Sequence, residues 1–193
     1  FSDYNQPMLE AMNRRLEGKG MRPSDENASL ARSCTISWKI SFLDLSRKSQ
    51  EVVIQYYRER AALDLEGYFA LLAWLHRSDA KQALRVEARH AQKAYIDHLN
   101  AESDRKKRVE LANKYGQALI AAGEPQMALD VCQFVFPDLV VFEGAKNDHH
   151  LWAAYTLLTI RVQALAGANR KDEAVQEIDR ILQVGYIPGI ADT

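Results

Sequence analysis

Residues 150–193 read HLWAAYTLLTIRVQALAGANRKDEAVQEIDRILQVGYIPGIADT, and this stretch decides the expected fold. Apolar residues recur at helical spacing through its first half, at Leu151, Tyr155, Leu158, Val162 and Leu165. Gly167 and Asn169 follow, and both residue types tolerate the backbone angles of a turn. The first half of the stretch therefore predicts a helix that ends in a tight turn.

A second helix is predicted directly after this turn. Asp172 and Glu173 stand in its first turn, where carboxylates interact favourably with the helix dipole. Ala174, Ile178 and Ile181 share one face, and Gly185 with Pro188 marks the end of the helix. Together the two helices form one predicted helical hairpin.

The register of this hairpin carries a family resemblance. It contains Ala168, Asp172-Glu173-Ala174, Ile178-Asp179, Ile181, Gly185-Tyr186 and Pro188. Over residues 156–190 this pattern resembles a pentatricopeptide repeat, and a tetratricopeptide repeat shares most of it, including the small residue at Ala174. The glycine that those repeats carry between their helices is Asn169 here. The resemblance implies an all-α fold of stacked antiparallel helical hairpins, an α-solenoid.

The remaining chain fits an N-terminal segment followed by such a domain. Residues 1–33 are polar and interrupted by proline and glycine, which predicts an arm or cap with a short helix near residues 8–16. Residues 34–193 predict a helical-repeat domain of about four hairpins. The small or β-branched residues expected beside the turns are Val52, Ala83, Ala128 and Ala174.

Two segments of this domain differ in how clearly they predict a helix. LDLEGYFALLAWLH, residues 63–76, is apolar around most of a helix, which predicts a central helix with Trp74 largely buried. Residues 34–46 are ambiguous, because Ile36, Trp38 and Ile40 alternate as in a strand, whereas Ile36, Ile40 and Leu43 share a helical face. Since the sequence offers no second strand to pair with it, we expect a helix.

Composition excludes some classes of protein. The net charge is −1, whereas a dedicated nucleic-acid-binding domain usually carries a basic excess. No apolar run reaches membrane-spanning length, so we expect no membrane span. Cys34 and Cys132 are far apart and belong to no metal or redox motif, which favours two free buried thiols.

Motifs for catalysis or metal binding are absent from the sequence. There is no nucleophile elbow, HExxH motif, CxxC pair or glycine-rich dinucleotide loop. Asp148-His149-His150 comes nearest to a metal cluster, but adjacent histidines on a helix do not easily face one ion. We expect a solvated helix start capped by Asp148 there. The sequence thus predicts no catalytic, cofactor or metal site, and no enzyme.

One polar feature suggests a binding surface, and it is basic. The residues Lys81, Arg85, Arg89 and Lys93, called the basic stripe below, recur every four positions on one helical face. Like charges at this spacing destabilise an isolated helix slightly. The basic cluster, Arg105, Lys106, Lys107 and Arg108, follows in the first turn of the next predicted helix, where cations oppose the helix dipole.

The stripe and the cluster have two interpretations. A solvated surface is the commoner explanation for a run of charges. The functional alternative is a docking face, with stripe and cluster close together, for an acidic protein surface, RNA phosphates or anionic lipid headgroups.

Two functions remain open at this point. The first is a non-enzymatic interaction or scaffold module that binds protein partners within a larger assembly, since solenoids present extended surfaces. The alternative is RNA binding of the pentatricopeptide type, in which successive repeats each contact one base. The resemblance also implies an organelle, most often the mitochondrion.

Overall fold

The computed structural model describes residues 6–19, 25–35, 41–142 and 148–184. Within these ranges the chain forms helices and no strand, so the all-α prediction is confirmed. The chain divides into two compact units, Phe1–Tyr95 and Ile96–Thr193, which we describe one at a time. The division falls inside helix α5, Lys81–Ala101.

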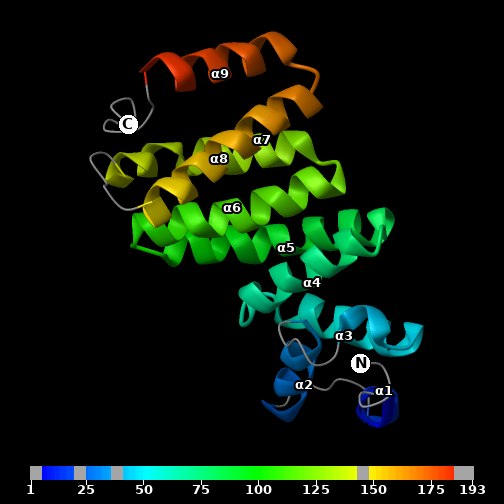
Figure 1. Ribbon diagram of the computed structural model, residues 1–193. Helices are drawn as coiled ribbons and strands as arrows, with labels where there is room; N and C mark the ends of the chain where they lie inside the picture. Colours follow the sequence, from blue (N-terminus) through cyan, green and yellow to red (C-terminus); the bar gives the residue numbers. More distant parts are fainter. Residues whose placement is uncertain (1–5, 20–24, 36–40, 143–147, 185–193) are drawn as a thin grey trace. The chain divides into compact units, whose positions relative to one another are not determined.

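The first unit is built from α-helices and one short 3₁₀ helix. In chain order these are α1 (Gln6–Lys19), α2 (Asp25–Thr35), η1 (Phe42–Asp44), α3 (Arg47–Arg60), α4 (Leu65–Arg77) and most of α5. Helix α1 packs against α3, and α4 packs against both α2 and α3 (Figure 1). The predicted N-terminal arm, residues 1–33, contains α1 and most of α2. Leu16 and Ala31 of these helices are buried and contribute to the core of this unit.

The helix that we expected across residues 34–46 does not run through this segment. Helix α2 ends at Thr35, and Ser41 and Leu45 are extended on either side of η1. Ser41 accepts a hydrogen bond from the backbone of Leu43, and Phe42 is buried, so a cap and one anchored ring fix this short turn. Residues 36–40 lie outside the described part, which leaves the choice between strand and helix open there.

Helix α4 is the buried helix that the apolar run 63–76 predicts. Asp64 caps it by accepting a hydrogen bond from the backbone of Gly67 at 3.0 Å, and Tyr68, Leu71 and Leu72 are fully buried. Trp74, however, is only partly buried, and its indole Nε1 donates to the carbonyl of Thr35 at 2.7 Å. The centre of this core is therefore formed by Tyr68 and its apolar neighbours, with Trp74 at its edge.

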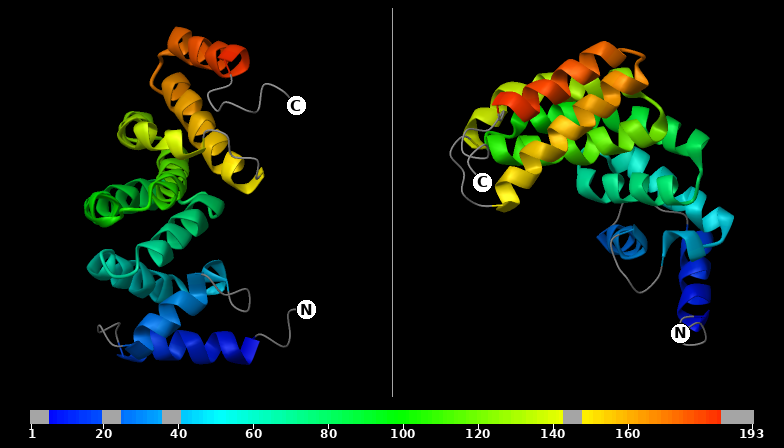
Figure 2. Two further views of the ribbon diagram at one scale, coloured as in Figure 1. Left: turned by 90° about the vertical axis from the view of Figure 1, so that its left-hand side faces the viewer. Right: turned by 45° about the horizontal axis from the view of Figure 1, so that its top comes forward.

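The second unit contains the end of α5 and the elements that follow it. These are α6 (Arg105–Ala122), α7 (Pro125–Val135), η2 (Phe136–Phe142), α8 (Asp148–Gly167) and α9 (Lys171–Val184). Helices α6, α7 and α8 pack against one another, and α9 packs on α8 (Figure 2). Asp104 caps α6, and Gly123 after α6 and Asn169 after α8 adopt positive φ angles of 73° and 62°. The turn predicted at Asn169 is thus present, whereas Gly185 lies outside the described residues.

The last helix packs with a face that differs at one position from the predicted one, because Ile181 is partly buried whereas Ile178 is exposed. Ala174 is buried as expected, but the other buried position is Glu177, whereas Ile178 is 41% exposed. Arg161 of α8 holds Glu177, with 2.9 Å between Nε and Oε1. This ion pair turns the Ala174 and Glu177 side of α9 toward α8. The apolar side chains of Val175, Ile178 and Leu182, called the α9 outer face below, are left exposed.

Candidate partner-binding surfaces

The basic stripe lies on the exposed side of α5. All four of its residues are exposed, while Leu84, Ala88 and Ala91 on the opposite side are buried. Lys81 lies 3.6 Å from the carboxylate of Asp79, and none of Arg85, Arg89 and Lys93 is without an interaction partner. None of the four side chains is therefore an isolated charge.

The buried side of α5 carries a carboxylate that the sequence argument overlooked. Glu87 is 1% exposed and accepts hydrogen bonds from Arg58 of α3 and from the hydroxyl of Tyr68, at 2.8 Å in each case. Hydrogen bonding to Glu87 raises the pKa of the Arg58 guanidinium, so this cation stays charged. The helical register gave a signal for this site, because Glu87 stands three residues after Leu84 and four before Ala91 on the apolar face.

The basic cluster at the start of α6 is partly engaged inside the second unit. Arg108 donates to Asp138 at 2.7 Å and to the carbonyl of Leu99 at 2.9 Å, and its guanidinium lies 5.5 Å from the ring centre of Phe134. Arg105 lies 3.8 Å from the same carboxylate. Arg108 therefore anchors η2 to α6.

The remaining residues of the cluster are more available to a partner. Lys107 is exposed and Lys106 is partly exposed, while their backbone N–H groups face the capping carboxylate of Asp104. The cluster belongs to the second unit and the stripe to the first. The proximity of stripe and cluster consequently stays a prediction, as does their role in binding.

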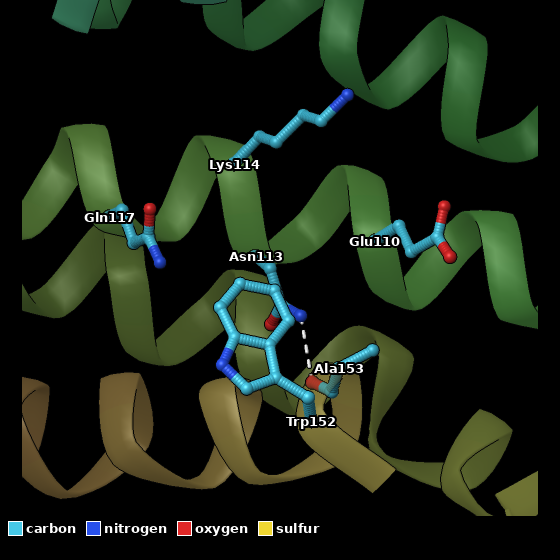
Figure 3. Close-up of a pocket in the computed structure, with 6 residues that line it drawn as sticks. All are labelled: Glu110, Asn113, Lys114, Gln117, Trp152 and Ala153. Atoms are coloured by element: carbon cyan, nitrogen blue, oxygen red, sulfur yellow. Dashed lines mark hydrogen bonds between the residues drawn. The ribbon is translucent and has the colours of Figure 1, made fainter. Parts of the chain in front are cut away.

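A pocket of about 230 Å³ opens in the second unit between α6 and α8 (Figure 3). We call it the α6–α8 pocket; it is lined by Glu110, Asn113, Lys114, Gln117, Trp152 and Ala153. The side chain of Asn113 is 5% exposed, and its Nδ2 donates to the carbonyl of Ala153 at 2.7 Å. Among the residues that the structure describes, no group donates to Asn113 Oδ1. This pocket has no counterpart among the sites that the sequence predicted.

Trp152 and Glu110 give the pocket its chemistry. The indole of Trp152 is 62% exposed, so a large aromatic surface stands at the edge of the pocket. The carboxylate of Glu110 lies on the exposed side of α6. The arrangement thus combines an aromatic face, one anion, one cation and one buried acceptor.

No group of three or more His, Cys, Asp or Glu in the described ranges is placed to hold a metal ion. Asp148, His149 and His150 open α8, but their side chains lie outside the described part. No helix among those described is both long and apolar enough to cross a membrane, in agreement with the sequence. Cys34 and Cys132 are free and buried, which confirms that prediction.

Comparison with protein-family models, curated proteins and solved structures gives no significant match. The resemblance to pentatricopeptide and tetratricopeptide repeats therefore stays a prediction that rests on the residues of the last hairpin.

Proposed function

We propose that this chain is a non-enzymatic interaction module of stacked helical hairpins that binds a protein partner within a larger assembly. The hairpins of the second unit would be α6 with α7 and α8 with α9. The proposal is supported by the packing of α6 on α7, of α8 on α9, and of α6 on α8. Short turns at Gly123 and Asn169 join the members of each pair.

The observation that carries this proposal is the α9 outer face. Val175, Ile178 and Leu182 are 56%, 41% and 78% exposed and stand at positions i, i+3 and i+7 of one helix. Apolar side chains grouped on one helical face typically mark a surface that a partner covers. The basic stripe is a second candidate surface for such a partner, by charge attraction to an acidic protein.

The alternative function is RNA binding of the pentatricopeptide type. It is favoured by the resemblance of residues 156–190 and by the cations of the stripe and the cluster. The near-neutral net charge and the engagement of Arg108 with Asp138 favour the protein partner instead. We also propose that the protein works in the mitochondrion, the organelle that the repeat resemblance implies.

The test is to isolate the chain from cells after crosslinking and to identify what is attached. A protein partner should be retained by the wild type and lost from the Val175→Lys, Leu182→Lys double variant. The matched control is Gln176→Lys with Asp179→Lys, which adds positive charge at exposed polar positions of the same helix. Crosslinked RNA without a protein partner would support the alternative and defeat the proposal.

A further inference from the structure

We propose that the α6–α8 pocket binds a cationic side chain, arginine above all, presented by a protein partner. This inference rests on the proposed function as an interaction module and names the chemistry of the segment that the module recognises. It concerns a surface separate from both the basic stripe and the α9 outer face.

Asn113 brings a buried acceptor to the lining of the pocket. Asn113 Nδ2 is committed to the carbonyl of Ala153, which fixes the amide with Oδ1 as its remaining polar atom. Within the described residues no donor reaches Oδ1. A buried acceptor without a donor costs about 1–3 kcal/mol, so a ligand that brings an N–H group gains by satisfying it. The pocket therefore favours a donor.

Trp152 brings an exposed aromatic surface to the pocket. Trp is the side chain that attracts a cation most strongly through its ring face, and guanidinium groups are frequent partners. The indole of Trp152 is largely exposed and is not held in the core, so it can rotate to admit a side chain and to cover it. A guanidinium can stack on this ring while its N–H groups point toward Asn113 and Gln117 (Figure 3).

The charged residues in the lining of the pocket bear on the ligand that it accepts. Glu110 places a carboxylate at the pocket, which attracts a cation and repels a phosphate. Lys114 is the one cation among the lining residues that the structure describes, and it takes part in an interaction of its own. Its chain also extends away from Trp152 and Asn113 (Figure 3). Glu110 is therefore the lining residue that can pair with a cationic ligand.

A nucleobase is the competing ligand. The carboxylate of Glu110 disfavours it, because a nucleotide brings a phosphate that this carboxylate repels. Asn113 itself does not separate the two ligands, since Nδ2 gives one of its two N–H groups to Ala153 and keeps the other. A volume of about 230 Å³ also suits one long side chain, since a water molecule takes about 30 Å³ in the liquid.

The test is a titration of the ¹⁵N-labelled whole chain with the capped peptide Gly-Gly-Arg-Gly-Gly, followed by NMR. We expect the indole Nε1–H signal of Trp152 and the side-chain amide of Asn113 to shift together, with a Kd on the order of 1 mM for so small a ligand. The same peptide with citrulline, which keeps the shape but removes the charge, should bind at least about threefold more weakly.

Two variants locate the site. Glu110→Gln changes an exposed residue, so it should leave the fold intact and weaken arginine binding about threefold. Asn113→Leu should abolish the titration, while Asn100→Leu and Asp130→Asn, at exposed positions outside the pocket, should leave it unchanged. If Asn113→Leu does not fold, Glu110→Gln decides the matter.

Other outcomes overturn the inference in distinguishable ways. Equal binding of the arginine and citrulline peptides would remove the role of charge. Shifts with adenosine or uridine monophosphate but not with the arginine peptide would assign the pocket to a nucleobase. The absence of any chemical-shift change at Trp152 and Asn113 with every ligand would show that the pocket is not a binding site. None of these results affects the crosslinking test of the interaction module, which depends on α9.

Discussion

The guanidinium of Arg58 lies against the carboxylate of Glu87, with 2.8 Å between Nε and Oε2, and joins α3 to α5 across 29 residues of sequence. Glu87 is almost fully buried, whereas the side chain of Arg58 is 37% exposed. The hydroxyl of Tyr68 on α4 binds the same carboxylate. One buried anion therefore holds α3, α4 and α5 of the first unit together. Glu87 lies on the buried side of α5, and the basic stripe lies on the exposed side of the same helix.

Removing Arg58 should destabilise the first unit because it leaves Glu87 buried without its cation. We expect Arg58→Met to cost about 2 kcal/mol in the free energy of unfolding, at the lower end for a buried pair because Arg58 is partly solvated. Urea denaturation measures this loss. The matched control is Arg47→Met, since the Arg47–Glu51 pair is exposed on both sides and should contribute less than about 0.5 kcal/mol. If the two variants lost the same free energy of unfolding, the pair of Arg58 with the buried Glu87 would contribute no more than an exposed pair.

Gly67 should not tolerate a side chain. A Cβ atom there would lie 2.7 Å from the ring of Tyr57, which is fully buried, so we expect Gly67→Ala to cost about 1–3 kcal/mol by overpacking. Gly18 in α1 has nothing within 4 Å of the same position. Gly18→Ala should therefore be neutral or stabilising by up to about 1 kcal/mol. Thermal denaturation of the two variants compares the sites, and a neutral Gly67→Ala would contradict this packing.

The two thiols should be unreactive in the folded protein. Burial raises the pKa of both Cys34 and Cys132 to about 12. In the unfolded chain the pKa of a thiol is about 8.5, so the folded state binds these protons more tightly than the unfolded state does. The resulting stability is fully present below about pH 8.5 and is lost as the pH rises from there toward 12.

A thiol reagent measures this difference at pH 8. The native chain should react far more slowly than the chain in urea, where both cysteines should react. Rapid reaction of one thiol in the native chain would show that its burial is transient.

The basic stripe should bind its partner through charge. We expect the double variant Arg85→Glu, Arg89→Glu to weaken partner binding strongly while it changes stability by about 1 kcal/mol or less, because both residues are exposed. The matched control reverses two other exposed charges of the first unit, Arg14→Glu and Arg15→Glu. Salt separates the kinds of partner, since RNA held through phosphates loses affinity steeply and a protein interface responds less. Unchanged binding by the Arg85, Arg89 variant would leave the α9 outer face as the contact.

Much of the helical framework was predictable because it is encoded locally. Asp64 and Asp104 begin helices where their side chains can cap the next turn, and Asn169 marks a turn because it tolerates a positive φ. These preferences act over a few residues, so spacing alone reveals them. Residues 41–46 were missed because a cap at Ser41 and the burial of Phe42 prevailed over helical spacing.

By itself, then, the sequence determined that the chain is helical, where the buried helix α4 and the turn between α8 and α9 lie, and which side of α5 carries the basic stripe. Only the tertiary structure decided which polar groups lie inside and which apolar groups lie outside. Asn113 meets Ala153 across 40 residues, and Arg161 turns α9 so that Glu177 is buried and Ile178 is exposed. The physical reason is that the burial of a side chain depends on neighbours from other helices, and those neighbours are set by packing rather than by position in the chain.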